Sequence, residues 1–290
     1  MPRFNVYVPL GLDDALNYLE ENASETLPVA GATDLLPRIK KKQVVAKNLV
    51  DLSGLSELRY VRREDGKIRI GALTTIADLE AESNNSTWGR LLSDVVTKFG
   101  SPNIRSVATV GGNICAASSS EDLLPVFLVL DAKVKTIRKS GTREVPLREF
   151  MIAKRRTALG SGEILSEVSF PEPSRRSACS FQKLGMRNIL IIALVSIAAF
   201  LQLNERDTKI KTARIALNRL EAKIPQRAEN VEKEIVGKEL NERTIESGVD
   251  RLGDELALTS DFRASAEYRE EAVKVLLRRA LVDCQQRILE

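Results

Sequence analysis

Residues 109–113 read Thr109-Val110-Gly111-Gly112-Asn113, and this stretch is the most informative in the chain. Glycine has no Cβ to hold a ligand away, so paired glycines let the backbone come close to a phosphate. Earlier in the chain, Val29-Ala30-Gly31-Ala32-Thr33-Asp34-Leu35 repeats the pattern of an apolar run followed by small and hydrogen-bonding residues. Backbone N–H groups that converge in such turns bind anions. The two turns are therefore predicted to hold one pyrophosphate between them, although a Gly-Gly pair alone more often marks an ordinary loop.

Length and composition indicate a globular protein of two or more domains. The chain has 290 residues, of which 29% are charged and 43% hydrophobic, and its net charge is only +4. Such values are ordinary for globular domains. The one local basic cluster, Arg38–Lys42, is interpreted as the solvated end of a helix, where cations interact favourably with free carbonyls. Without an aromatic-lined basic face, nucleic-acid binding is not expected.

Cysteine and histidine content excludes several kinds of chemistry. Cys115, Cys179 and Cys284 lie far apart, and the chain has no histidine. Histidine-based zinc sites, Ser-His-Asp triads and a cluster held by four cysteines of this chain are therefore impossible, and no metal site is expected. The N-terminus has no apolar signal core, so a cytoplasmic location is expected. The apolar run Ile189–Leu203 is shorter than the roughly 18 residues of a membrane span and is predicted as buried core, as a strand or a helix.

The pattern of elements predicts mixed α and β structure. Residues 12–21 have the apolar spacing of an amphipathic helix, and Asp65-Gly66 between residues 58–62 and 67–70 favours a tight hairpin. The other predicted strands are 26–30, 48–52, 133–137, 143–145, 163–170, 190–203 and 211–217. The other predicted helices are 33–41, one that begins at Thr75 and includes Glu80, 91–99, 123–130, 227–236, 241–253 and 265–287. Pro171–Ser177 is predicted to be a linker between domains.

The segment Phe99–Pro125 resembles the second flavin-binding segment of the FAD subunits of molybdenum hydroxylases. These are the medium subunits of carbon monoxide dehydrogenase, xanthine dehydrogenase and aldehyde oxidoreductase complexes. The resemblance runs from Phe4 to Leu281. It includes Gly31–Leu36, Leu49–Ser53, Ile70–Thr74, Gly162–Leu165, Lys183–Arg187 and Pro225–Ala228.

This resemblance implies an α+β protein with the p-cresol-methylhydroxylase-like FAD-binding fold. Two α/β lobes, 1–57 and 58–172, would be followed by an α+β C-terminal domain, 178–290. The implied function is an FAD-dependent oxidoreductase subunit that takes electrons from an iron–sulfur subunit and passes them to an external acceptor. Molybdopterin and [2Fe-2S] clusters would lie on a large and a small partner subunit, in a dimer of heterotrimers.

The resemblance also implies which residues bind FAD, and it implies no catalytic residue. The two turns would contact the diphosphate, Asp122 sugar hydroxyls, Leu165 the flavin or adenine, and Lys183 the isoalloxazine. The turn residues are Ala30, Gly31, Ala32, Thr33, Asp34 and Leu35 in the first turn, and Thr109, Gly111, Gly112 and Asn113 in the second. Relatives often have glycine where this chain has Ala32, and aspartate where it has Ile191.

Each assignment has a structural alternative. Thr33 and Asp34 suit a helix N-cap, and Asp122 suits the start of a helix. Leu165 suits a strand core, and Lys183 suits a solvated surface. Two other functions also remain open: a non-redox subunit that has lost FAD, and a free-standing flavoenzyme of the same fold.

Overall fold

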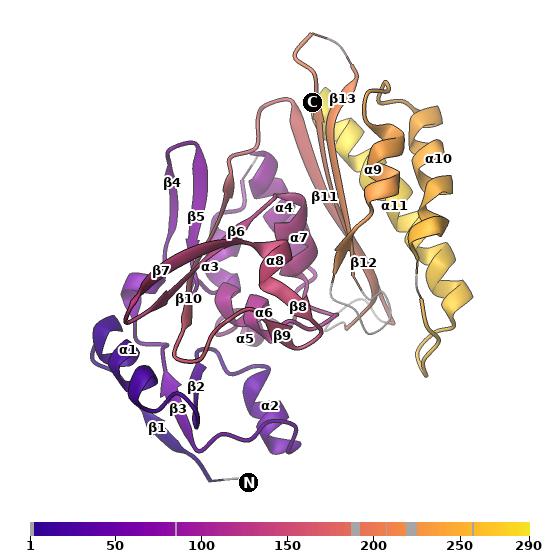
Figure 1. Ribbon diagram of the computed structural model, residues 1–290. Helices are drawn as coiled ribbons and strands as arrows, with labels where there is room; N and C mark the ends of the chain where they lie inside the picture. The colour runs from indigo at the N-terminus through magenta and orange to yellow at the C-terminus, as the bar shows by residue number, and fades with distance from the viewer. Residues whose placement is uncertain (1–2, 85, 187–191, 207, 219–224, 257) are drawn as a thin grey trace. The chain divides into compact units, whose positions relative to one another are not determined.

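The computed structural model describes residues 3–84, 86–186, 192–206, 208–218, 225–256 and 258–290 (Figure 1). These residues divide into two compact units. The first consists of Met1–Leu79, Ser101–Ala117 and Ala132–Pro171, and the second of Glu80–Gly100, Ser118–Asp131 and Glu172–Glu290. The predicted domains 1–57, 58–172 and 178–290 are consecutive along the chain and stay a prediction. Each compact unit, in contrast, consists of three separate segments of the chain, and both units contain residues from before position 172.

The first unit begins with a small parallel sheet of order β1-β3-β2, formed by β1 (Asn5–Tyr7), β2 (Thr26–Val29) and β3 (Asn48–Asp51). Helix α1 (Leu12–Glu21) has the bounds predicted from its apolar spacing, and Ala15, Leu16 and Leu19 are buried. Helix α2 (Leu35–Lys40) follows β2. The polypeptide between β2 and α2 is the first predicted turn.

A five-stranded antiparallel sheet forms the rest of the first unit's framework, in the order β4-β5-β10-β6-β7. Asp65 and Gly66 connect β4 and β5 with φ values of 52° and 66°, which confirms the predicted hairpin. The strands are β4 (Val61–Glu64), β5 (Lys67–Gly71), β6 (Lys133–Arg138), β7 (Gly141–Pro146) and β10 (Ile164–Pro171), with a separate hairpin of β8 (Met151–Ala153) and β9 (Arg156–Thr157). Short helices α3 (Ile76–Ala81), α5 (Pro102–Arg105), α6 (Val110–Ala116) and α8 (Leu147–Phe150) connect them.

The second unit is a four-stranded antiparallel sheet with helices on both faces (Figure 1). Its strands are β11 (Ser177–Gly185), β12 (Ala193–Leu203), β13 (Ile210–Asn218) and β14 (Gln226–Arg227). Helices α4 (Thr87–Val96) and α7 (Leu123–Val129) pack on one face, and α9 (Glu229–Ile235) and α11 (Ala266–Leu289) pack on the other, with α10 (Glu242–Arg251) beside them. No helix in the described part of the chain is long and apolar enough to cross a membrane.

Strand β12 is buried on both faces. This explains why the apolar run 189–203 could be predicted either as a strand or as a helix. All but one of its residues are buried, so the strand reads as a continuous apolar segment without alternation. The structure therefore assigns residues 193–203 to a strand, while residues 189–191 lie outside the described ranges. Strand β11 and helix α6 were not predicted, and α4 begins at Thr87, before the predicted residue 91.

A buried carboxylate ties β6, β7 and β10 together. Glu163, which precedes β10, is 5% exposed and accepts hydrogen bonds from Arg143 Nε and Nη2 (both 2.7 Å), from Thr136 Oγ1 and from the Gly160 N–H (2.6 Å). Burial by itself raises the pKa of the Glu163 carboxyl, but these hydrogen bonds outweigh it and lower the pKa to about 2. The ionised form is thus strongly favoured in the folded protein.

We expect Glu163→Gln to remove a pH-dependent part of the stability. Because the folded pKa is below the ordinary value of 4.5, the contribution is present above pH 4.5 and disappears as the pH falls towards 2. The free energy of unfolding should differ between wild type and variant by about 3 kcal/mol at pH 7. Urea unfolding at several pH values measures this difference, which should shrink steadily below pH 5. Glu144→Gln, at an exposed ion pair with Lys133, serves as the control and should show no such trend. A constant difference between wild type and Glu163→Gln down to pH 2.5 would contradict the assignment.

Candidate functional site

The first turn presents a row of backbone donors. Among the described residues, none accepts a hydrogen bond from the N–H of Gly31, Ala32, Thr33 or Asp34, and this segment is partly or fully exposed. Ala32 adopts the left-handed conformation with φ 57°, which explains why glycine suits this position. Successive N–H groups in such a turn form a concave binding site for an anion. The first turn therefore has the chemistry expected for a diphosphate.

The second glycine segment lies directly against the first turn. A Cβ atom on Gly31 would stand 1.8 Å from the carbonyl oxygen of Val107 and 3.1 Å from the Cα of Ala108. This close approach is possible only for glycine, and it places the first turn beside the segment that enters residues 109–113. The structure thus brings together the two stretches that the sequence paired.

Residues 109–113 form the start of helix α6 and not the predicted turn. Thr109 is its N-cap, and its Oγ1 accepts a hydrogen bond from the Gly112 N–H (3.0 Å). Two other N–H groups donate to the β5–α3 connection, from Val110 to the Thr74 carbonyl and from Gly111 to the Ala72 carbonyl. The Asn113 N–H donates to the Thr109 carbonyl. The free backbone donors are consequently found at the first turn, not at this segment.

The two glycines of α6 have different surroundings. Gly111 is buried, and a Cβ there would stand 2.7 Å from the Ala72 Cβ, so its absence allows the helix to pack on the β5 end. Gly112 is exposed, and a Cβ there would approach only the Thr109 hydroxyl. Gly111 therefore serves packing, whereas Gly112 leaves a bare stretch of backbone that a ligand can contact.

The capping alternative for the first turn is not observed. Asp34 occupies the N-cap position of α2, but its side chain makes no capping hydrogen bond. Instead, Asp34 Oδ2 accepts a hydrogen bond from Arg155 Nη1 (2.8 Å) and lies 3.5 Å from Arg38 Nη1. The side chain of Thr33 is exposed. Arg155 was missed from the sequence because it is one of three adjacent cations, Lys154–Arg156, with no pattern to distinguish it.

Leu165 lies in β10, where the pairing with β6 is shifted between Leu165 and Glu167. Its residue exposure is only 4%, which agrees with the strand-core alternative. A contact from Leu165 to the flavin or adenine stays a prediction.

Asp122 and Lys183 form a buried ion pair in the second unit. Lys183 Nζ donates to Asp122 Oδ2 (2.6 Å) and to the Lys98 carbonyl (3.0 Å), and the two side chains are 1% and 8% exposed. Lys183 is therefore buried, and the alternative interpretation of Lys183 as a solvated surface residue is wrong. Asp122 directly precedes α7, but its side chain does not cap that helix.

One oxygen of this ion pair remains available. Asp122 Oδ1 is buried and has no hydrogen-bond partner among the described residues. Burial raises the pKa of the Asp122 carboxyl above its ordinary value, and the Lys183 ammonium opposes that rise. A carboxylate only accepts hydrogen bonds, so Oδ1 is suited to a hydroxyl donor. The contact of Asp122 to a sugar hydroxyl stays a prediction.

Comparison with known proteins identifies the family. Residues 2–173 match the family described as the FAD binding domain in molybdopterin dehydrogenase, and residues 181–284 match the CO dehydrogenase flavoprotein C-terminal domain. The chain belongs to this molybdopterin dehydrogenase flavoprotein family. The predicted resemblance is thereby confirmed.

Relatives of this flavoprotein family match the chain over nearly its full length. The nicotinate dehydrogenase FAD-subunit of Eubacterium barkeri is 30% identical, and the match covers 98% of this chain and 96% of that protein. The carbon monoxide dehydrogenase medium chain of Afipia carboxidovorans is 28% identical over 96% of this chain and 95% of that protein. A solved structure of a Cu,Mo-CO dehydrogenase in its cyanide-inactivated form superposes with a TM-score of 0.91, with 28% identity and 99% of both chains covered. The predicted α+β flavoprotein fold is therefore confirmed.

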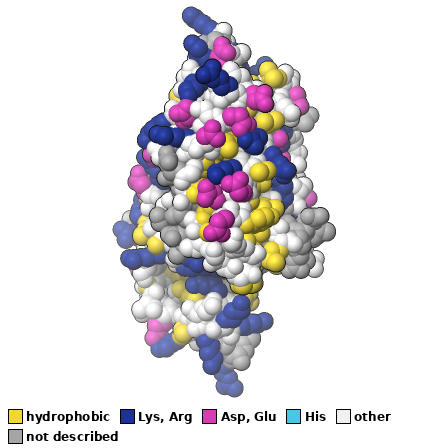
Figure 2. Space-filling view, turned by 90° about the vertical axis from the view of Figure 1, so that its right-hand side faces the viewer, with side chains coloured by type: hydrophobic (Ala, Val, Ile, Leu, Met, Phe, Trp, Pro, Cys, Tyr) yellow, Lys and Arg dark blue, Asp and Glu magenta, His cyan; other side chains and the backbone are white. Residues whose placement is uncertain are grey.

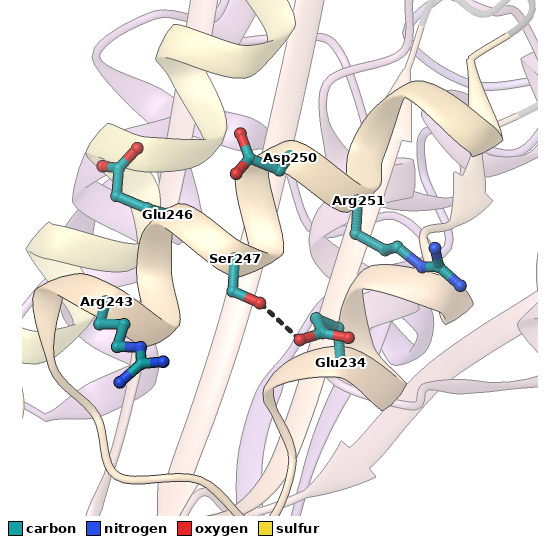
Figure 3. A pocket seen from close by; sticks show the side chains of 6 residues that line it. All are labelled: Glu234, Arg243, Glu246, Ser247, Asp250 and Arg251. Carbon is teal, nitrogen blue, oxygen red and sulfur yellow. Dashed lines mark hydrogen bonds between the residues drawn. The ribbon is translucent and has the colours of Figure 1, made fainter.

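A surface pocket in the second unit is lined by none of the residues that were predicted to bind FAD. It lies between α9 and α10, has a volume of about 530 Å³, and is lined by Glu234, Arg243, Glu246, Ser247, Asp250 and Arg251 (Figure 3). Ser247 donates a hydrogen bond to Glu234, and Glu246 pairs with Arg278. On the face that carries α9, α10 and α11, acidic, basic and apolar side chains intermingle (Figure 2). The pocket is best described as part of a mixed, solvated surface.

The acidic side chains and the three cysteines of the described residues show how they are placed for metal binding and for thiol chemistry. Over the described ranges, no group of three or more histidine, cysteine, aspartate or glutamate side chains is placed to hold a metal ion. Cys115, Cys179 and Cys284 are free thiols, and burial raises the pKa of each above its ordinary value. A raised pKa keeps a thiol protonated and unreactive.

We expect Gly31→Ala to destabilise the protein by about 3 kcal/mol, because the added Cβ meets a backbone carbonyl that cannot move without the α6 segment. Gly112→Ala is the matched control. Its Cβ meets only the Thr109 hydroxyl, and the higher helix propensity of alanine offsets the weakened N-cap bond, so its stability should stay within about 1 kcal/mol of wild type. Chemical unfolding of the two variants measures both values. Equal stability of the two variants would show that the turns are not packed together.

Proposed function

We propose that the chain binds one FAD, with its diphosphate hydrogen-bonded to the N–H groups of Gly31–Asp34 and packed against the exposed backbone of Gly112. The observation that carries this proposal is the set of four neighbouring N–H groups without acceptors among the described residues. They lie beside the glycine segment in a chain of a flavoprotein family. The segment is open to solvent, so these donors can exchange water for a phosphate, the kind of anion that successive backbone N–H groups bind.

The other proposed contacts use side chains. Thr109 and Asn113 follow from the family resemblance and lie in the α6 segment, while Asp122 Oδ1 would accept a hydrogen bond from a sugar hydroxyl. Lys183 uses two of its three N–H groups on Asp122 and the Lys98 carbonyl, so its ammonium is held in one place. FAD, when bound, supplies the redox chemistry, and the chain supplies binding, orientation and charge.

We further propose that the chain serves as the electron outlet of a larger cytoplasmic complex. An iron–sulfur subunit would deliver electrons to the FAD, a molybdopterin subunit would oxidise the substrate, and an external acceptor would take the electrons from the flavin. Relatives support a multi-subunit assembly by their names, which include a carbon monoxide dehydrogenase medium chain and subunit alpha of a 6-hydroxypseudooxynicotine dehydrogenase complex. A dimer of heterotrimers is the proposed arrangement.

Gly112→Val tests the diphosphate assignment. Its β-branched side chain would cover the bare backbone of α6, and we expect the Kd for FAD to rise about a hundredfold, equivalent to about 3 kcal/mol. Fluorescence titration of the apoprotein with FAD measures this affinity, and circular dichroism verifies the fold. Gly11→Val is the control, because Gly11 has extended backbone and open space. If the folded Gly112→Val protein binds FAD as tightly as wild type, the assignment fails. A wild-type protein that binds no FAD would instead favour the non-redox alternative.

We expect the FAD to be bound without a covalent link. The chain has no histidine to form one, and the three thiols are kept protonated by burial. Acid precipitation of the holoprotein should therefore release all of the flavin into the supernatant as intact FAD, measured by absorbance and mass spectrometry. Yellow colour that stays in the washed pellet, with a flavin mass on a peptide, would contradict this expectation.

A further inference from the structure

Arg155 connects the first turn to the end of helix α6. It lies in the two-residue turn between β8 and β9, and its Nη1 donates to Asp34 Oδ2 (2.8 Å) and to the Ala116 carbonyl (3.1 Å). The Arg155 backbone N–H donates to the Ala117 carbonyl (2.7 Å). One residue therefore holds both the aspartate that ends the N–H array and the last turn of the helix that carries Gly112.

Unfavourable backbone conformations gather around this connection. Six described non-glycine residues have positive φ, and three of them are Ala32 (57°), Ala117 (46°) and Arg155 (64°). Side chains with a Cβ atom are disfavoured in this region, where glycine is preferred. Strain that is concentrated in one place and kept by the surrounding contacts is typical of functional sites. At position 155, a glycine would satisfy the turn but could make neither side-chain hydrogen bond.

We propose that Arg155 is a positioning residue for the FAD diphosphate. It fixes Asp34, and with it the N–H groups of Gly31–Asp34, relative to α6, and it acts through these groups without a contact of its own to FAD. This inference rests on the proposed function of the first turn. Its physical basis is preorganisation: donors that are already held in place lose less freedom when a ligand binds.

The variant Arg155→Gly distinguishes an effect of Arg155 on FAD affinity from an effect on the stability of the fold. Glycine removes the two side-chain hydrogen bonds but relieves the left-handed backbone, so the unfolding midpoint of the apoprotein should stay close to that of wild type. Removing the supporting partners of metal ligands costs about 10–100-fold in affinity, and by analogy we expect the Kd for FAD to rise about tenfold or more. Fluorescence titration measures the Kd, and thermal unfolding of the apoprotein measures the stability.

Lys154→Gly is the matched control. Lys154 is the adjacent exposed residue of the same turn, has the same charge as Arg155, and makes no hydrogen bond or ion pair with the described residues. The Lys154→Gly variant should leave the Kd for FAD unchanged.

Salt dependence separates positioning from simple charge attraction. A purely electrostatic effect of Arg155 on the anionic cofactor would weaken as salt is added, whereas a positioning defect should persist at 0.5 M salt, where the Debye length is only about 4 Å.

A double-mutant cycle with Asp34→Ala tests the route of the effect. If Arg155 acts through Asp34, the Kd of the double variant should be close to that of Asp34→Ala alone. Arg155→Lys, which keeps the charge but not the planar fork, should bind FAD less tightly than wild type. Wild-type affinity in Arg155→Gly, an equal loss in Lys154→Gly, or full additivity with Asp34→Ala would each overturn the positioning role. A wild-type chain that binds no FAD would instead overturn the proposed function itself.

Discussion

The close approach of Gly31 to the Val107 carbonyl is the constraint on which the first unit's binding geometry depends. There is no space for even a methyl group, since a Cβ would lie 1.8 Å from that oxygen. The contact brings residues that are far apart in sequence to the same place, and the next three N–H groups have no acceptor among the described residues. Ala32 accepts a left-handed backbone within this arrangement, at a cost of about 1–2 kcal/mol. Packing, and not local preference, therefore determines the shape of the turn.

The second unit satisfies a different requirement, the burial of charge. Asp122 and Lys183 are almost inaccessible, and such a pair is stable only when hydrogen bonds compensate the lost hydration. The Lys98 carbonyl provides one of these bonds, and Asp122 Oδ1 remains without one among the described residues. An unsatisfied buried oxygen is unfavourable for the free protein. A ligand hydroxyl that donated a hydrogen bond to Asp122 Oδ1 would remove this penalty. The gain would add to the affinity, because the Asp122 side chain is already held in place and loses no further conformational entropy.

Local patterns in the sequence were sufficient for many elements but not for the site's support. Helix α1 and the β4–β5 hairpin follow from amphipathic spacing and from Asp65-Gly66, because both signals act between near neighbours. Helix α6 was missed because two glycines oppose a helix, and its first N–H groups are satisfied by Ala72 and Thr74, which are distant in sequence. The two glycine-containing stretches were paired from their residue pattern, and the roles of the other site residues came from family resemblance. Arg155 could not be distinguished from its cationic neighbours without the fold. The sequence likewise could not decide between strand and helix for β12, since burial on both faces removes the alternation of apolar and polar residues that marks a strand.

The division of the chain between the two units has a consequence for the order of synthesis. Helices α4 and α7 are made before residue 131, yet they pack on β11, β12 and β13, which begin only at Ser177. Trp88, Leu91 and Phe127, buried residues of these two helices, therefore leave the ribosome before the sheet on which the helices pack exists. Chains that grow at about 5–20 residues per second expose these side chains for several seconds. The second unit thus cannot complete its core until the C-terminal half of the chain has been made.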